Sequence, residues 1–330
     1  MCIRDRIYLL WFFLPCYFFG QTLYEESDEQ IVQSMNQTYA KGLGFLASAQ
    51  NKDGSWPDGS HGVEPGVVGM AILALLARGD DPEYGPYAEN IHRSINFLLT
   101  KQDKKSGFIG HTMYNHAFST LALAEAYGAA NDPRIGTALE RAVSLIVMAQ
   151  KKNSMGGWRY SPESVDADVT VSGAQLITLF AARNAGLKIP KESIEKGREF
   201  LLSCQEEKGG FGYTNSTGAN LPRTSIGSLV LSLSGENETK EYKKTVAYLH
   251  KNAKYDDQGH KFYNLYYTSQ AVFRADPKLW QSWNRENLRK LKGSQAEDGS
   301  WNGNYGKAFS TSAALLSLAL NYRYLPIYER

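Results

Sequence analysis

The chain has 330 residues, of which 42% are hydrophobic and 21% are charged, and its formal net charge at pH 7 is +2. This is the composition of an ordinary globular protein with enough chain for a large core. A charge so close to neutrality gives no electrostatic reason to bind nucleic acid or an anionic membrane, so we expect neither as a partner.

The first residues have the pattern of a secretion signal. Arg4 and Arg6 supply a short basic start, residues 7–19 are almost wholly apolar, and Gly20 offers a small residue for cleavage. The apolar run is short for a membrane-spanning helix. We therefore expect a signal peptide over residues 1–20, membrane contact only through that segment, and export to the periplasm or the extracellular space. A retained membrane anchor is the alternative.

After a polar and acidic lead-in over residues 21–38, the sequence repeats from Tyr39 onward with a period of about fifty residues. Each unit has an amphipathic helix pattern that often ends in Gln, then a turn, then a second helix pattern that is apolar nearly all round. The turns contain glycine and an aromatic residue, at Gly54–Trp56, Gly107–Phe108, Gly156–Trp158, Gly209–Phe211, Gly259–Phe262 and Gly299–Trp301. Strand-like alternation is nowhere sustained, so the predicted fold class is all-α.

Each part of the unit has a physical reason. The glycines permit a positive φ where the chain leaves the first helix, and the aromatic residue can fold back onto that helix. The first helix carries charges such as Glu195 and Lys196 beside Phe200 and Leu201, as an outer helix requires. The second helix is apolar on all sides, as a covered inner helix requires. Six such hairpins predict an α6/α6 toroid over residues 39–330.

Two segments carry a family resemblance. Gln50-Asn-Lys-Asp-Gly-Ser-Trp56 and Gln295-Ala-Glu-Asp-Gly-Ser-Trp301 resemble the Gln-Trp repeats of squalene and hopene cyclases. The Gly-Gly-Phe and Gly-Gly-Trp turns are similar to those of protein prenyltransferase β subunits. The chain more closely resembles secreted bacterial proteins with prenyltransferase and squalene oxidase repeats. The resemblance implies an α/α toroid whose site lies in the barrel cavity.

In such toroids, many functional residues come from the turns and the starts of the inner helices. We expect these segments to converge at one mouth of the ring, where the helix N-termini favour anions. The candidate ligand-binding residues are Tyr114, Tyr160, Tyr213, Arg223, Tyr263, Tyr267, Tyr305 and Lys307, and His61, Glu64, His111, Arg159 and Tyr266 lie in the same segments. The tyrosines could surround a ligand or pack against the turns. The cations could bind an anionic head group or be solvated.

The acidic segment Asp166-Ala-Asp168-Val-Thr170 occurs only in the third unit. It resembles the Asp-x-Asp-Asp-Thr motif of the cyclases, whose middle acid protonates a double bond. The resemblance implies Asp168 as the catalytic acid, and we expect Asp166 as its partner and His116 opposite. Val169 departs from the motif, and squalene-type cyclases use two toroids. The alternative interpretation is that an aspartate caps the following helix, and that His116 is a buried histidine bonded to a backbone carbonyl.

The sequence predicts neither a metal nor another cofactor. The resemblance to prenyltransferases would require a zinc-binding cysteine two residues after the aspartate. That position holds Asp168 after Asp166 and Thr170 after Asp168. No phosphate-binding glycine loop and no nucleophile elbow is present in the sequence.

Three functions follow from these patterns. The first is an exported toroid, similar to terpenoid cyclases and prenyltransferases, whose cavity binds an isoprenoid-like or other apolar ligand and, in an enzyme, acts on it through Asp168. The second is a non-catalytic toroid that binds a protein partner. The third is a polysaccharide-active α/α barrel that uses Asp166, Asp168 and Glu64. An aromatic cavity favours the first, a filled cavity the second, and an open groove with paired carboxylates the third.

Overall fold

The computed structural model describes residues 28–254 and 259–328. The signal peptide expected over residues 1–20 lies outside this range. No helix of the described residues is both long enough and apolar enough to cross a lipid bilayer.

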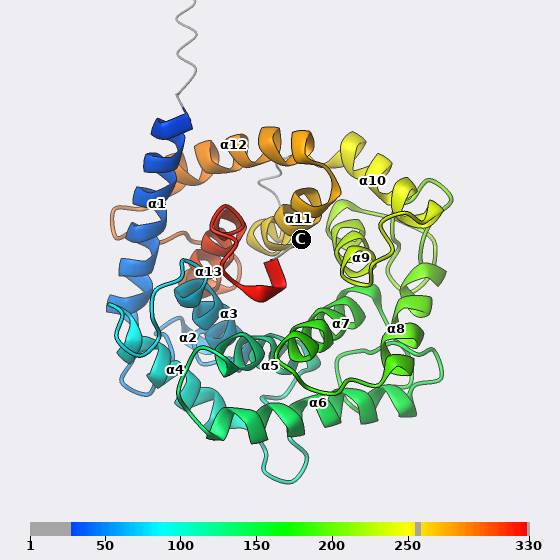
Figure 1. The fold of residues 1–330 in the computed structure, drawn as a ribbon, viewed down its shortest axis with the longest axis horizontal. Coiled ribbons are helices and arrows are strands. Elements are labelled where there is room, and N and C mark those ends of the chain that lie inside the picture. The colour runs from blue at the N-terminus through cyan, green and yellow to red at the C-terminus, as the bar shows by residue number, and fades with distance from the viewer. Residues whose placement is uncertain (1–27, 255–258, 329–330) are drawn as a thin grey trace, which may run out of the picture.

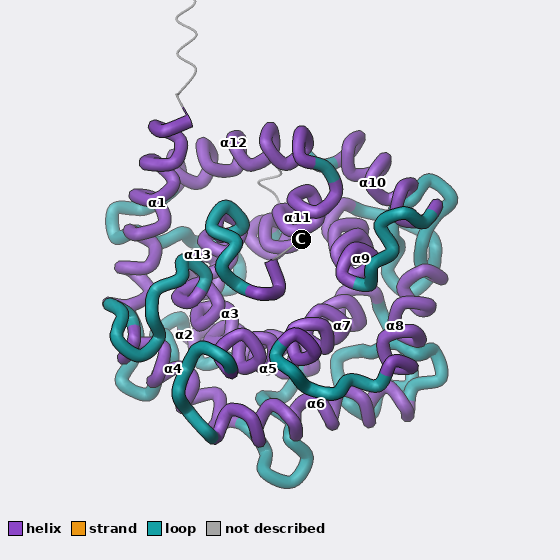
Figure 2. The backbone as a smooth tube through the Cα atoms, in the orientation of Figure 1, coloured by secondary structure: helices purple, strands orange, loops and turns teal. Residues whose placement is uncertain are grey.

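The helices form two concentric rings (Figure 1). The outer helices are α1 (Asp28–Ala49), α4 (Ala88–Lys101), α6 (Arg134–Lys152), α8 (Lys191–Ser203), α10 (Lys240–Asn252) and α12 (Pro277–Ser294). The inner helices are α3 (Pro65–Leu76), α5 (Met113–Tyr127), α7 (Val169–Asn184), α9 (Leu221–Leu233), α11 (Lys261–Ala275) and α13 (Gly306–Ala319). A short helix, α2 (Gly59–Gly62), precedes α3. Figure 2 shows helices and loops throughout the described residues, which confirms the predicted all-α toroid.

The two rings differ in burial, as the sequence predicts. Every residue of the inner helix α3 is buried, whereas the outer helix α4 buries one face that includes Ile91, Ile95 and Leu98. Neighbouring inner helices contact each other all the way round, and α13 packs against α3. The inner ring is therefore closed, and it is covered by amphipathic outer helices.

The recurring glutamines join successive units of the ring. Gln150 Nε2 donates to the carbonyl of Gly156 in its own turn (2.6 Å) and to that of Ser193 in the next outer helix (2.9 Å). Gln295 Nε2 makes the same two bonds, to Gly299 (2.9 Å) and to Thr38 (3.0 Å). Since Thr38 lies in α1, this last pair of bonds closes the outer ring.

The turns are held by their aromatic and glycine residues. The indole nitrogen of Trp158 donates to the carbonyl of Ile146 (2.8 Å), in the helix that the chain has just left, and Trp56 and Trp301 do the same. Gly299 has a φ of +86°, and a Cβ there would lie 2.2 Å from the carbonyl oxygen of Lys41. Only glycine fits this turn without a backbone shift.

The first outer helix begins earlier than the sequence pattern suggested. Residues 28–38, which we expected to belong to the polar lead-in, form the first half of α1. Ser34, Met35 and Thr38 are buried in this segment. One buried face is therefore present, but two of these three residues are polar, so the hydrophobic pattern of the sequence does not reveal the helix.

One end of the barrel is filled by the chain itself. After α13, the short 3-10 helix η1 (Pro326–Tyr328) enters the ring and contacts α7 (Figure 1). Leu325, Ile327 and Tyr328 are buried there, and Arg274 Nη2 donates to the carbonyl of Ile327 (2.7 Å). Because Arg274 lies near the C-terminus of α11, this is the end at which the inner helices finish.

Candidate functional site

At the other end, the starts of the six inner helices surround a cavity of about 700 Å³. We call it the mouth cavity. Its lining residues are His61, Glu64, Gly66, Val67, His111, Thr112, Tyr114, Asn115, Phe118, Tyr160, Thr170, Tyr213, Asn220, Pro222, Arg223, His260, Tyr263, Asn264, Tyr305 and Phe309. They include six of the eight residues that the sequence suggested for ligand binding. The structure thus brings the turns and inner-helix starts together at one mouth.

The inner part of the mouth cavity is aromatic. Phe118 lies against Tyr266, with their ring centroids 5.9 Å apart, and Tyr263 lies against Tyr267 at 4.9 Å. Tyr266 and Tyr267 are fully covered, so they form a layer beneath the wall and do not line it. Burial raises the pKa of Tyr263 and of Tyr267, so both phenols stay neutral.

The rim of the cavity contains stacked arginine and tyrosine side chains. The hydroxyls of Tyr160 and Tyr213 are hydrogen bonded at 2.5 Å, and the Arg159 guanidinium lies 5.3 Å from the centroid of each ring. The Arg223 guanidinium also lies over Tyr213, 5.7 Å from the centroid of its ring. Tyr305 stacks on the imidazole ring of His260, and its hydroxyl is hydrogen bonded to His260 Nδ1. These rings present both apolar faces and polar edges at the opening.

Asp168 is the N-cap of α7. Its Oδ1 accepts hydrogen bonds from the backbone N–H groups of Thr170 (2.8 Å) and Val171 (2.9 Å), and from the Thr170 hydroxyl (2.5 Å). Thr112 and Asn220 cap α5 and α9 from the corresponding positions. The capping interpretation is therefore correct for Asp168, and the third unit differs from its neighbours in using a charged cap.

The second oxygen of Asp168 has a different environment. Oδ2 is buried without a hydrogen bond and lies 3.4 Å from Arg159 Nε. Burial raises the pKa of Asp168, although the bonds from Thr170 and Val171 and the Arg159 charge oppose this shift. Asp166 is exposed and pairs with Arg159 Nη1 at 2.8 Å. The two aspartates are therefore bridged by one arginine, and Asp166 does not line the cavity.

Asp168 reaches the cavity wall only through two other residues. The Tyr114 hydroxyl donates to Thr170 Oγ1 (2.6 Å), and the Thr170 hydroxyl donates to Asp168 Oδ1 (2.5 Å). Tyr114 and Thr170 line the mouth cavity, whereas Asp168 is fully buried behind them. Thr170 is therefore a residue of the site that was not among the candidates predicted from the sequence. The Asp-x-Thr spacing is the signal that could have found it, because such pairs bond locally at helix starts.

His116 lies on the outer side of α5, away from the mouth cavity. Its Nδ1 accepts from the backbone N–H of Ile109 (3.2 Å), and its Nε2 lies 3.0 Å from the carbonyl of Ala142 in α6. Burial lowers its pKa to about 4, so the ring is neutral. In other units Ser172, Thr224 and Thr311 receive the equivalent turn N–H. The expectation that His116 faces Asp168 is therefore corrected, because it connects two ring layers.

Lys307 also lies outside the cavity. Its Nζ pairs with Asp298 Oδ2 (2.8 Å) in the turn before α13, and it lies over the ring of Phe45. The expectation that it binds an anionic head group at the mouth is corrected by this geometry. Arg223 is the candidate cation that remains at the rim, where its guanidinium donates to the backbone carbonyl of Gly218.

The acidic group of the cavity wall is Glu64. Its Oε2 accepts from Asn115 Nδ2 (2.6 Å), and its Oε1 lies 3.4 Å from His111 Nε2. No second carboxylate lines the cavity in the described residues. Within residues 28–254 and 259–328, no group of three or more His, Cys, Asp or Glu side chains is arranged to hold a metal ion.

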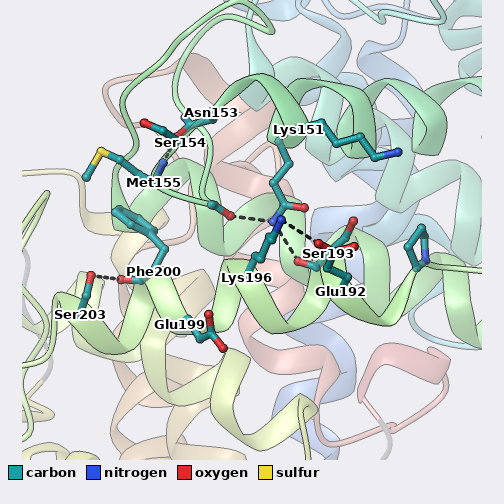
Figure 3. Close-up of a pocket in the computed structure, with 13 residues that line it drawn as sticks. Lys151, Asn153, Ser154, Met155, Glu192, Ser193, Lys196, Glu199, Phe200 and Ser203 are labelled. Atoms are coloured by element: carbon teal, nitrogen blue, oxygen red, sulfur yellow. Dashed lines mark hydrogen bonds and ion pairs between the residues drawn. The ribbon is translucent and has the colours of Figure 1, made fainter.

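A second hollow lies on the outside of the ring, between α6 and α8 (Figure 3). There Gln150 makes its two structural bonds, and Lys196 pairs with Glu192 one turn away at 2.7 Å. Because these polar groups already bond to each other or to the backbone, the outer hollow offers few free groups to a ligand. The candidate site is therefore the mouth cavity.

Several solved structures share this fold. The type II terpene cyclase MstE from Scytonema matches with a TM-score of 0.61 and 15% identity, over 89% of this chain and 99% of the cyclase. One MstE variant is solved with geranylgeranyl dihydroxybenzoate, its substrate. The GH76A α-1,6-mannanase from Salegentibacter sp. HEL1_6 matches with a TM-score of 0.66 and 9% identity, over 86% of this chain and 98% of the mannanase. Its inactive variant, changed at two aspartates, is solved with α-1,6-mannotetrose.

At such low identities these likenesses concern the fold alone. No curated protein matches the chain in sequence. The family model described as "Domain of unknown function (DUF6288)" matches residues 29–328, which is almost the whole of the described toroid. The chain therefore belongs to the DUF6288 family.

Proposed function

We propose that the mouth cavity binds an elongated apolar ligand, such as an isoprenoid. The observation that carries the proposal is an aromatic cavity of about 700 Å³ that is open at the mouth and backed by buried rings. This volume lies in the usual range for small-molecule sites, roughly 300–1,000 Å³. Phe118, Phe309 and Tyr263 would contact the apolar part of the ligand. The isoprenoid substrate of MstE, which has the same fold, supports this choice of ligand class.

The rim would hold the polar end of the ligand. Tyr160, Tyr213 and Tyr305 offer hydroxyls there, and Arg223 offers a cation that joins no ion pair among the described residues. An arginine stacked on a tyrosine ring is well placed to bind an oxygen-rich group. Export of the protein, from its apolar residues 7–19, is part of the same proposal.

Proton-transfer chemistry is a second candidate, favoured by one observation. Asp168 is buried, its pKa is raised, and its Oδ2 has no hydrogen bond. These are properties of a carboxyl group that can stay protonated. We infer that Asp168 would be the acid if the bound ligand is cyclised. Binding is the better supported function, because Asp168 stands behind the wall and Oδ2 faces Arg159.

The other two functions have less support. A polysaccharide-active barrel would need paired carboxylates across a groove, and the described lining residues contain Glu64 alone. An interaction module would not need a hollow mouth, although the filled end near Tyr328 is compatible with it.

The test is to purify the protein from its native envelope and to identify retained lipids by mass spectrometry. Asn264→Trp fills the cavity from its wall, and Asn237→Trp places the same side chain in an exposed turn at the other end of the ring. We expect an apolar molecule in the wild type and in Asn237→Trp, and little in Asn264→Trp. Equal retention by all three proteins, or none in the wild type, would contradict the proposal.

Asp168→Asn tests the second candidate in the same experiment. Cyclisation conserves mass and changes chromatographic retention. If Asp168 is the acid, the variant will retain an isomer that elutes differently from the wild-type ligand. Identical ligands in both proteins would be consistent with binding as the function and would contradict the role of Asp168 as a catalytic acid.

A further inference from the structure

We propose that the wall of the mouth cavity presents a hydrogen-bond acceptor at Tyr114, and that the site therefore selects ligands with a hydroxyl group. The proposal rests on the proposed binding function and specifies the ligand class. It is carried by the chain of bonds from Tyr114 through Thr170 to Asp168, with distances of 2.6 and 2.5 Å.

The direction of this chain is fixed at its buried end. Backbone N–H groups can only donate, and two of them, from Thr170 and Val171, point at Asp168 Oδ1. Oδ1 is therefore an acceptor, and the Thr170 hydroxyl at 2.5 Å must be the donor of the bond between them. Oδ1 is an acceptor whether Asp168 is ionised or neutral, because a proton on the carboxyl would sit on Oδ2.

The direction of the second hydrogen bond, between Tyr114 and Thr170, follows from that of the first. With its own proton directed at Asp168, Thr170 Oγ1 can accept the bond from the Tyr114 hydroxyl. Tyr114 has one proton, and that proton is directed at Thr170. Its remaining lone pair is available to the cavity, of which Tyr114 forms part of the wall. A tyrosine hydroxyl usually offers a ligand either role, but here the donor role is already taken.

The environment strengthens this selection. Burial raises the pKa of Tyr114, so the phenol keeps its proton at neutral pH. The neighbouring Tyr263 hydroxyl is close enough to influence that pKa, but its oxygen is buried without a hydrogen-bond partner, so it does not occupy the remaining lone pair of Tyr114. In a low-dielectric site, a ligand oxygen without a proton would meet the Tyr114 oxygen with lone pairs facing each other. An alcohol would donate to it, whereas an aldehyde or an ether would be disfavoured.

The test compares two probes that differ in this one property. Farnesol and farnesal have the same isoprenoid chain, and the first ends in a hydroxyl whereas the second ends in an aldehyde. Calorimetric titration gives the ratio of their dissociation constants for each protein. We expect farnesol to bind the wild type roughly threefold to tenfold more tightly, the usual effect of one neutral hydrogen bond.

Three variants identify the source of the preference. Tyr114→Phe removes the acceptor and should bring the ratio close to one. Thr170→Val keeps the side-chain shape and frees the Tyr114 proton, so farnesal should bind more tightly than in the wild type. Tyr322→Phe removes a hydroxyl that donates to Asn36 Oδ1 far from the mouth, and should keep the wild-type ratio. Thermal unfolding of each variant verifies that it is folded.

The outcomes separate this inference from the binding function beneath it. Tight binding of both probes with no preference, or a preference that persists in Tyr114→Phe, would contradict the role of Tyr114 as an acceptor. Either result would leave the proposed binding function of the cavity in place. Failure of the wild type to bind either probe would overturn both.

Discussion

Replacement of Asp168 by alanine and by asparagine should have clearly different effects on stability, because the fold uses one carboxyl oxygen much more than the other. Alanine removes Oδ1, which accepts from the Thr170 and Val171 amides and from the Thr170 hydroxyl. Asparagine keeps an oxygen at that position and changes only the group beside Arg159, 3.4 Å away.

The expected magnitudes follow from these bonds. Loss of an N-cap side chain destabilises a protein by about 0.5–2 kcal/mol. Loss of the acceptor for a side-chain hydroxyl adds about 1 kcal/mol. We therefore expect Asp168→Ala to lower the free energy of unfolding by about 2–3 kcal/mol. For Asp168→Asn we expect less than about 1 kcal/mol, because the lost attraction to Arg159 is partly offset by removal of a buried charge.

Urea unfolding followed by tryptophan fluorescence measures both values, since Trp158 is buried in the turn that leads to Asp168. Because burial raises the pKa of Asp168, the folded state holds its proton more tightly than the unfolded state does. Relative to Asp168→Asn, the wild type should thus lose stability as the pH rises above about 4 and through the raised pKa. Equal destabilisation by alanine and asparagine would refute the capping account.

Three further perturbations test the architecture. Burial lowers the pKa of His116 to about 4. Relative to His116→Gln, the free energy of unfolding of the wild type should therefore fall by on the order of 3 kcal/mol as the pH decreases from about 6.5 to about 4. A difference that does not change with pH would contradict the buried neutral ring. Gln295→Ala should lower the unfolding free energy by about 2–3 kcal/mol by opening the contact between α12 and α1, whereas exposed Gln33→Ala should change it by less than about 0.5 kcal/mol. Gly299→Ala should destabilise by more than about 2 kcal/mol in the same urea assay, because both its φ of +86° and the Lys41 carbonyl oppose a Cβ; a smaller loss would mean that the turn can shift.

The fold was predictable because each unit repeats the same local physics. Gln150, Gly156 and Trp158 recur at matching positions, and in the structure their equivalents make the same hydrogen bonds in other units. The filled end of the barrel was not predictable in this way. Leu325 to Tyr328 follow the last repeat and have no earlier copy, so their place inside the ring depends on contacts far along the chain, such as that with Arg274.

The candidate site was predictable in location but not in detail. Tyr114, Tyr160 and Tyr213 follow the turns, and the geometry of the hairpins brings them to one mouth. For Asp168, the two interpretations differ in where the carboxyl points, which depends on its place at the start of α7. His116 was misplaced for a related reason, because its slot corresponds to the small hydroxyl residues Ser172 and Thr224, and a histidine there gives no sign of equivalence.

The most direct test of the cavity proposal is an experimental structure of the protein determined with farnesol. We predict that the isoprenoid chain lies in the mouth cavity against Phe118 and Tyr263, with its hydroxyl within hydrogen-bond distance of the Tyr114 oxygen. Density for farnesol only in the second hollow, between α6 and α8, with solvent in the mouth cavity, would contradict the proposed function.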